Sequence, residues 1–321
     1  MSFPSWSEIE CAAVTGGLAP TALRRMRDFY RRVAECPELR MLLSAMKERL
    51  AEPKPCDGAE AAKVFPRVEE RDAFHLLVLL GGFTAASAGW RQRGFPAELF
   101  TAAWRDAGIW TAHHEENLHS TGISLRILNW MKLHCESRIA RPGRLEFEFD
   151  LDFNFKLRII RNRDGRPEAI PESADLPDVD TLLAPGDPVA AIHIPADGPL
   201  LPGECLNSLR RFRRFAARHL TGRPPRALVC ESWLLDPQLR RLLPRDSNIV
   251  QFQQIAGTLL PLAQPADTVW RVFGDAGLRD GIFNRRNCNS LQRRIVDFVR
   301  DGGEFHMGFL YIPIEELDAL L

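Results

Sequence analysis

The strongest constraint on the fold is a run of strictly alternating residues between positions 145 and 155. Charged or amide side chains occupy every second position, and apolar ones occupy the others: Leu145, Phe147, Phe149, Leu151, Phe153 and Phe155. Successive side chains of a β-strand point to opposite faces, so this period of two predicts a strand with one buried face. The turn sequence Arg-Asp-Gly-Arg at 163–166 predicts a hairpin or a bent pair of strands.

Residues 1–140 follow the helical period instead. Apolar residues recur every three or four positions, with arginines on the other side, in the segment 20–36, and four further segments are helical by pattern: 38–50, 70–80, 96–107 and 118–133. β-Branched residues are scarce in this half. The apolar run 76–88 is too short to span a bilayer and contains Gly81 and Gly82, so we expect a buried helix or helix pair there.

The pattern changes at Arg141-Pro142-Gly143, and a chain of 321 residues is long enough for two domains. We therefore expect domains at 1–140 and 141–321. In the second domain, strands are predicted at 189–194, 227–232, 269–273 and 305–311, and helices at 204–220, 237–243 and 290–299. The segment 166–188 is expected to be a connecting loop, and 248–252 to be strand-like or loop.

The order of strand, helix and strand in the second domain implies a right-handed crossover and at least two parallel strands. The predicted fold class is α+β, with an all-helical N-terminal domain followed by a mixed α/β sheet domain.

Composition excludes several classes of partner. The 42 basic and 42 acidic residues cancel, which removes the bulk electrostatic reason to bind nucleic acid or an anionic membrane. The arginines of 210–218 are assigned to the solvated face of their helix. Seven scattered cysteines without a CxxC pair favour reduced thiols and a cytoplasmic protein, and the first residues lack a secretory signal. The oligomeric state is left open.

The loop 194–203, between the predicted strand and helix, is the first candidate site. Ligands of open parallel sheets gather at the carboxyl ends of strands, and a helix N-terminus offers free N–H groups to an anion. However, this loop contains three prolines and no basic residue, and it matches neither GxGxxG nor a P-loop. A plain connector is therefore the alternative reading.

Polar side chains at the ends of two strands form the second candidate. His193 lies near the end of the strand at 189–194, and Glu231 and Ser232 end the strand at 227–232. If the strands are neighbours, a carboxylate and an imidazole face each other as an acid/base pair. The alternative is structural: His193 as a satisfied structural residue of its strand, and Asp236 as the N-cap of a helix opened by Pro237.

The sequence His113-His114-Glu115-Glu116-Asn117-Leu118-His119 invites a metal-binding reading. The HExxH motif needs histidines four residues apart on one helix face around a Glu, and position 118 is Leu. We therefore assign this segment to a solvated helix face or a turn and predict no metal site.

Several segments together carry a family resemblance. They are residues 141–147, Ile192-His193-Ile194-Pro195, Gly198-Pro199-Leu200, the run from Ser232 to Pro237, and Ser247-Asn248-Ile249, with residues 110–130 in the helical half. In combination they resemble a GNAT-like acyltransferase family whose members pair a helical N-terminal acyltransferase domain with a GNAT-like C-terminal domain. The resemblance covers nearly the whole chain.

The resemblance implies an N-acyltransferase that moves an acyl group from acyl-CoA to a small amine acceptor, with CoA or acyl-CoA as co-substrate. The strand at 189–194 would lie on the cofactor side and the strand at 227–232 would splay from it. Proton transfer falls to His193, Glu231 or Ser232. The implied cofactor-binding residues are Ile194, Pro195, Gly198, Leu200, Gly203 and Glu204.

Two departures from the family pattern support a different expectation. The loop lacks the usual Arg or Gln, and the usual Tyr acid is missing, because the chain contains only Tyr30 and Tyr311. A non-catalytic ligand- or protein-binding protein on the same GNAT-like fold is therefore the alternative function.

Overall fold

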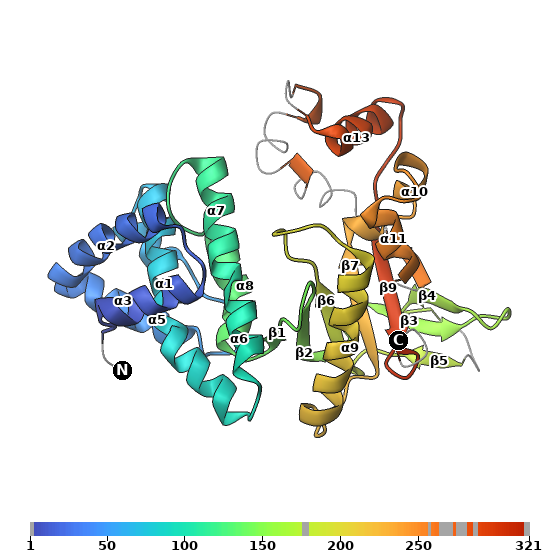
Figure 1. Cartoon of the computed structure of the whole chain (residues 1–321), viewed down its shortest axis with the longest axis horizontal. Helices are drawn as coiled ribbons and strands as arrows, with labels where there is room; N and C mark the ends of the chain where they lie inside the picture. The colour runs from blue at the N-terminus through green and yellow to red at the C-terminus, as the bar shows by residue number, and fades with distance from the viewer. Residues whose placement is uncertain are drawn as a thin grey trace. The chain divides into compact units, whose positions relative to one another are not determined.

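The computed structural model describes residues 3–174, 180–255, 258–262, 272–273, 281–284 and 288–317 (Figure 1). By their contacts, the residues form two compact units, 1–142 with 195–197 and 143–194 with 198–321. Helices make up the first unit and a mixed sheet with helices makes up the second, so the predicted α+β class is confirmed.

The first unit is built from amphipathic helices. In α2, the buried residues Ala22, Met26, Phe29 and Val33 recur every three or four positions, as the sequence pattern predicted. The described helices are α1 (Trp6–Thr15), α2 (Pro20–Glu35), α3 (Pro37–Arg49), α4 (Ala59–Val64), α5 (Val68–Gln92), α6 (Ala97–Trp104), α7 (Asp106–Leu118) and α8 (Leu125–Cys135). The short strand β1 (Ile139–Ala140) follows them.

Helix α5 passes through Gly81-Gly82 without a break, so of the two expectations for 76–88, a buried helix or a helix pair, the single helix is confirmed. A Cβ on Gly82 would lie 2.7 Å from Leu50 Cδ1, and a Cβ on Gly81 would lie 3.3 Å from Pro4 Cγ. The glycines therefore serve close packing on α5 and do not end it. The helix is long and apolar enough to cross a membrane, but 61% of its most apolar window is buried within the protein, as in a core helix.

The histidine-rich segment forms the end of α7, and the prediction that it is a solvated face or a turn is wrong for one of its histidines. His113 is exposed and His119 ends the helix with a left-handed φ of 55°. His114, however, is buried. Its Nδ1 donates to the Ser120 carbonyl (2.7 Å) and its Nε2 donates to Asp72 Oδ2 of α5 (3.0 Å). Since both ring nitrogens face acceptors, His114 is an imidazolium paired with a buried carboxylate.

This ion pair makes the stability of the helical unit depend on pH. Burial pushes the pKa of His114 down, but the bonds to Asp72 and Ser120 outweigh it and raise the pKa above its ordinary 6.5. Burial pushes the pKa of Asp72 up, but hydrogen bonds from His114 and His75 outweigh it and lower the pKa below 3.8. The stabilisation is therefore full between these ordinary values. It is lost as pH rises through the pKa of folded His114, or falls through that of folded Asp72.

We expect His114→Gln to cost more unfolding free energy at roughly pH 5.5 than at roughly pH 9, because only the charged imidazole contributes the ion pair. Urea unfolding of the variant and the parent at both pH values measures this. His113→Gln, on the exposed neighbouring residue, is the matched control. An equal cost of His114→Gln at both pH values would contradict the charged state of His114.

The second unit contains a mixed sheet and a smaller antiparallel sheet. Its strands are β2 (Glu146–Asp152), β3 (Leu157–Arg161), β4 (Pro167–Pro171), β5 (Thr181–Leu183), β6 (Pro188–His193), β7 (Ala227–Ser232), β8 (Thr258–Leu262) and β9 (Met307–Pro313). Its described helices are α9 (Pro202–His219), η1 (Trp233–Leu235), α10 (Leu239–Leu242), α11 (Asn248–Ile255), η2 (Ile282–Asn284) and α13 (Ser290–Arg300). Within this unit, the larger sheet has the order β2-β6-β7-β9-β8 and the smaller one β4-β3-β5.

Strands β6 and β7 are parallel and are joined through α9, as predicted from the order of elements. The other pairs of both sheets in this unit are antiparallel. The predicted strand at 227–232 has the bounds of β7, and the predicted strand at 189–194 is displaced by one residue in β6.

The alternating run does not form one uniform strand. The pairing of β2 with β6 shifts between Glu148 and Leu151, and Asp150 has a φ of 58°, so a β-bulge interrupts β2. Before the bulge, Phe147 stacks on Phe212 of α9, with ring centroids 4.2 Å apart. Beyond it, the extra residue turns the apolar positions to the opposite face of the sheet. One sequence pattern thereby supplies two cores.

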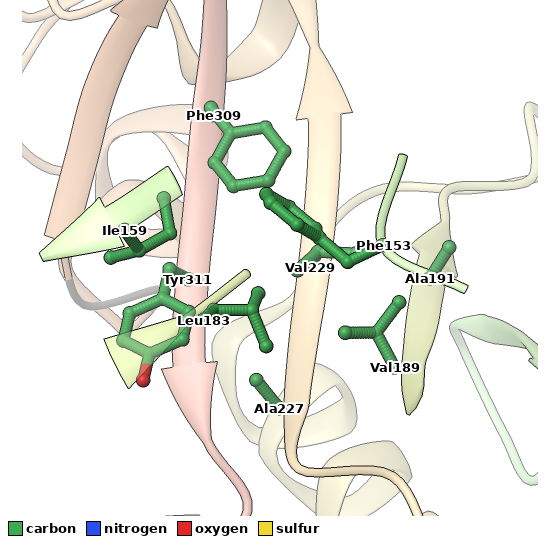
Figure 2. Close-up of a cluster of buried hydrophobic side chains, with 9 residues drawn as sticks. All are labelled: Phe153, Ile159, Leu183, Val189, Ala191, Ala227, Val229, Phe309 and Tyr311. Atoms are coloured by element: carbon green, nitrogen blue, oxygen red, sulfur yellow. The ribbon is translucent and has the colours of Figure 1, made fainter. Parts of the chain in front are cut away.

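The second core lies between the two sheets (Figure 2). Strands β6, β7 and β9 of the larger sheet and strands β3 and β5 of the smaller one contribute to it. Phe153, from beyond the bulge, packs among them. The buried members are Phe153, Ile159, Leu183, Val189, Ala191, Ala227, Val229, Phe309 and Tyr311. The larger sheet is thus covered by α9 on one face and by the smaller sheet on the other.

Two predictions for the second unit are wrong, and a third falls mostly outside the described residues. The expected loop 166–188 contains β4 and β5, because β4 is an edge strand that tolerates Pro167 and Pro171 at its ends. The segment 248–252 belongs to helix α11. The strand expected at 269–273 falls mostly outside the described residues, and Val272 and Phe273 are helical.

Candidate active site

The two parallel strands separate at their carboxyl ends. Their pairing runs from Val189 with Ala227 to Ala191 with Val229. Each strand then continues, β6 to His193 and β7 to Ser232, without a further pair between them among the described residues. Beyond these pairs, the facing backbone edges of β6 and β7 no longer pair with each other. A split of this kind can hold an extended ligand that completes the ladder.

His193 is the last residue of β6, on the rim of this split. Its Nε2 lies 3.3 Å from Glu148 Oε2, and the two side chains are 30% and 11% exposed. The register of β2 and β6 explains the contact, because Glu148 pairs with Ala191 and thereby shares a sheet face with His193. The carboxylate orients the ring through this contact.

Glu231 lies on the same sheet face as His193. Val229, two residues earlier on β7, pairs with Ala191, two residues before His193 on β6. Side chains two positions apart on a strand share a face, so the continued register sets Glu231 opposite His193 across the split. The structure therefore directs both predicted residues to one face, with Glu148 alongside.

Ser232 has a structural role in the described residues. It is the N-cap of η1, where its Oγ accepts the N–H of Leu234 at 3.2 Å. Asp236 has a wider capping role than predicted. Its Oδ1 accepts the N–H of Gln238 and its Oδ2 accepts the N–H of His306, so it ties η1 to the start of β9.

The loop after β6 is held by arginines that are distant in the sequence. Arg144 donates from Nε to the Pro199 carbonyl (2.9 Å) and from Nη2 to the Gly198 carbonyl (2.5 Å). Arg141 Nη2 lies 2.6 Å from Asp197 Oδ2. Of the other predicted ligand contacts, Ile194 is half-buried, whereas Pro195 and Leu200 are buried. The conformation of the loop is thus set by side chains outside it.

The start of α9 offers less to an anion than an ordinary helix N-terminus. Pro202 has no N–H, and the N–H groups of Glu204 and Cys205 both donate to the Leu201 carbonyl. Gly203 keeps an N–H that the described hydrogen bonds do not use, and a Cβ at this position would meet no atom within 4 Å. The exposed carboxylate of Glu204 repels an anion. At the start of α9, the described hydrogen bonds therefore leave the N–H of Gly203 for an anion.

An open depression of about 500 Å³ adjoins this helix end. It is lined by Pro202, Arg245, Asp246, Gln251, Gln254 and Ile255. Arg245 brings a positive charge from outside the loop, and Asp246 beside it reduces that charge.

Ser208 connects α9 to the loop-holding arginine. Its buried Oγ accepts the N–H groups of Arg144 (2.7 Å) and Leu145 (3.2 Å) and donates to the Glu204 carbonyl. We expect Ser208→Ala to cost about 2 kcal/mol of unfolding free energy, because two buried donors lose their acceptor. Urea denaturation measures this, with Asn207→Ala, on the exposed neighbour, as control. A cost equal to that of the control would contradict the role of Ser208.

Nucleophilic and phenolic groups near the split are not available for chemistry. Burial raises the pKa of Cys230 on β7 to about 12, and the charge of Glu231 adds to the shift, so this thiol stays protonated. Tyr311 is buried in the core between the sheets, and burial raises its pKa to about 12. Among the described residues near the split, the carboxylates and His193 remain as the proton-transfer groups.

Comparison with known proteins identifies the family. Residues 15–136 match the N-acyltransferase N-terminal domain, and residues 139–310 match the GNAT-like C-terminal domain. The chain belongs to this family of GNAT-like acyltransferases with a helical N-terminal domain. The two matched segments correspond closely to the helical and mixed units of the fold. No curated protein matches the chain by sequence.

Solved acyltransferase structures share the fold of this GNAT-like chain. A mutant acyltransferase in complex with octanoyl-CoA has a TM-score of 0.72 and 21% identity, over 97% of this chain and 89% of its own. An acyltransferase in complex with decanoyl-CoA and teicoplanin has a TM-score of 0.64 and 21% identity, over 95% of this chain and 99% of its own. A complex with CoA and 10C-teicoplanin has a TM-score of 0.63 at the same identity and coverage.

Sequence reasoning missed Glu148, Arg141 and Arg144 as site residues. Glu148 occupies a polar position of the alternating run, where a solvent-facing side chain is the ordinary expectation. Only the pairing of β2 with β6 reveals that this position faces His193. The sequence carried no separate signal for Glu148, because the burial of residues 146–149 appears only in the folded chain.

Proposed function

We propose that the protein is an acyl-CoA-dependent N-acyltransferase that acts on the amine of a small-molecule acceptor, with the acyl thioester bound in the split between β6 and β7. The split between adjacent parallel strands carries the proposal, because the pairing of β6 with β7 stops at Ala191 and Val229, beside a histidine and two carboxylates. Membership of the acyltransferase family supports the reaction class.

The donor assignment rests on the shape and chemistry of the split. The pantetheine arm of CoA contains two amide groups in series, and these can pair with strand edges as a peptide does. Solved structures with the same fold hold octanoyl-CoA, decanoyl-CoA or CoA, which supports an acyl-CoA donor. Two of them also hold teicoplanin or 10C-teicoplanin, which supports a small-molecule acceptor.

The proposed chemistry uses the groups on the shared face. The acceptor reaches the site as an ammonium ion, which the carboxylates of Glu148 and Glu231 attract. His193 takes its proton, and Glu148 stabilises the imidazolium that results. The amine nitrogen then forms a bond to the thioester carbonyl carbon as the C–S bond breaks. The surplus proton of that nitrogen passes to the leaving thiolate, so that an amide and a free thiol result, and His193 afterwards releases its proton to solvent. Backbone N–H groups at the split polarise the carbonyl.

The first test is donor binding. We expect octanoyl-CoA to raise the unfolding temperature, because a ligand at a hundred times its Kd stabilises the folded state by about 2.7 kcal/mol. Thermal unfolding with octanoyl-CoA, CoA and ATP measures it, with ATP as a control for phosphate binding alone. A folded protein that is not stabilised by millimolar octanoyl-CoA would contradict the proposal.

The second test separates catalysis from binding. Octanoyl-CoA is incubated with a panel of primary amines, including amino sugars, and free thiol is measured. Amine-dependent thiol release supports the transferase. Tight donor binding without release across the panel would instead favour the alternative function, a non-catalytic acyl-CoA-binding protein.

A further inference from the structure

The outer side of α9 carries a stripe of arginines that the proposed reaction does not use. Arg211, Arg214 and Arg218 are exposed, and their spacing of three and four residues places them on one side of the helix. Arg210 and Arg213 add positive charge beside this arginine stripe. Glu204, in the first turn, is the only acidic residue of α9. A chain with zero net charge thus concentrates positive charge on one helix face.

The arginine stripe lies on the same element as the candidate active site. Helix α9 begins directly after the loop that follows β6, at the split. With a rise of about 1.5 Å per residue, the stripe extends from roughly 14 to 24 Å along α9 from Pro202. A macromolecule bound to the stripe would therefore lie within a flexible arm's reach of the split.

The positive charge of α9 is not gathered where the pyrophosphate of CoA would lie. The loop 194–201 has no basic residue, Pro202 has no N–H, and Glu204 places a negative charge at the helix start. Acyl-CoA and an acyl carrier protein present the same acyl-phosphopantetheine arm and differ only in what the arm is attached to. A site that recognises the arm but offers little to the pyrophosphate accommodates either donor.

We infer that the arginine stripe docks an acidic carrier protein that presents the acyl group on its phosphopantetheine arm. This inference rests on the proposed transferase function, since it assumes a thioester in the split. Positive and negative surfaces that complement each other steer association and add specificity. The arm would pass from the docked carrier to the opening between β6 and β7.

Other anionic partners fit the stripe less well. A single-stranded nucleic acid needs exposed aromatic rings for stacking, but Phe212 and Phe215 of α9 are buried. A membrane-surface helix inserts its apolar side into the lipid. The apolar side of α9 is already packed on the sheet, where Phe147 stacks on Phe212 and Phe149 lies beside Phe215.

Calorimetry with two donors tests the inference without a known acceptor. One donor is an acidic acyl carrier protein loaded with an octanoyl group, and the other is octanoyl-CoA. We expect the triple variant Arg211→Glu, Arg214→Glu and Arg218→Glu to weaken carrier binding about tenfold or more and to leave octanoyl-CoA binding unchanged. Carrier binding by the parent protein is expected to weaken with added salt. The control is Arg24→Glu with Arg27→Glu, on exposed residues of α2.

The outcomes distinguish this inference from the proposed function. If the triple variant weakens octanoyl-CoA binding as much as carrier binding, the stripe recognises the phosphates of CoA and the inference is overturned. Carrier binding that is undetectable, or equal in parent and variant, also overturns it. If the parent binds the carrier but not octanoyl-CoA, the CoA-dependent function fails and the docking surface stands.

Discussion

His193→Ala is expected to lower the rate of amine-dependent thiol release by about 10²- to 10⁴-fold, the contribution typical of a positioned general base. Because His193 ends β6 and its side chain is 30% exposed, the fold should tolerate the change. The measurement is single-turnover transfer from octanoyl-CoA to the best amine of the panel, with circular dichroism and octanoyl-CoA binding as checks on the fold. A variant that keeps more than about a tenth of the parent rate would refute the assignment of the base.

The same assay distinguishes the roles of the residues around His193. Glu148→Gln keeps the size of the side chain but removes the charge beside His193, so we expect a smaller loss, about tenfold, and a changed pH–rate profile. Glu231→Gln tests the carboxylate across the split. Ser232→Ala is the control, because its hydroxyl caps η1. It should leave the rate nearly unchanged and cost about 1 kcal/mol of stability.

Glu148 must be distinguished from a residue that merely supports the strand. Loss of packing would lower stability and donor binding together. A positioning role predicts instead that kcat falls while the Kd for octanoyl-CoA is preserved, and that the pH at which the rate reaches half its maximum moves. If donor binding weakens in proportion to the rate, Glu148 supports the structure alone.

The fold was largely predictable where one physical signal dominated. The change from helical to alternating periodicity separated the two units, and the short apolar runs flanking α9 located β6 and β7. The bulge at Asp150 was not predictable, because a strict alternation gives no sign that its apolar face changes sides partway. Strands β4 and β5 were missed because turn-forming residues surround them, and their stability comes from pairing with β3.

The arrangement of the candidate site was predictable in part, for a related reason. Polar residues at two strand ends pointed to His193 and Glu231, since parallel neighbours end at the same sheet edge. The partner Glu148 lies 45 residues before His193, and its position depends on the register of an antiparallel pair. Arg144 likewise reaches the loop only through tertiary folding. Sequence reasoning judged that loop by its own residues and could not see the arginines that hold it.

The largest effect on stability is expected at Gly308, on β9. It pairs with Ser232 of β7, and the chain of η1 passes directly over it. A Cβ on Gly308 would lie 2.1 Å from the Leu235 carbonyl oxygen and 2.2 Å from its carbonyl carbon. Backbone atoms cannot rotate away as a side chain does, so either η1 or β9 must move. We expect Gly308→Ala to cost about 3 kcal/mol or more of unfolding free energy.

Gly222→Ala is the matched control for Gly308→Ala, because a Cβ on Gly222 would meet no atom within 4 Å. Replacing a glycine by alanine where no strain results commonly stabilises the protein by about 0.4–1 kcal/mol, because alanine reduces the conformational entropy of the unfolded chain. The two substitutions thus add the same methyl group to the second unit, but one is expected to lower the unfolding free energy and the other to raise it. Urea denaturation compares them directly. Similar midpoints for the two variants would show that η1 does not press on β9. A destabilised Gly308→Ala that also loses octanoyl-CoA binding would place η1, which follows Ser232, among the elements that hold the split open.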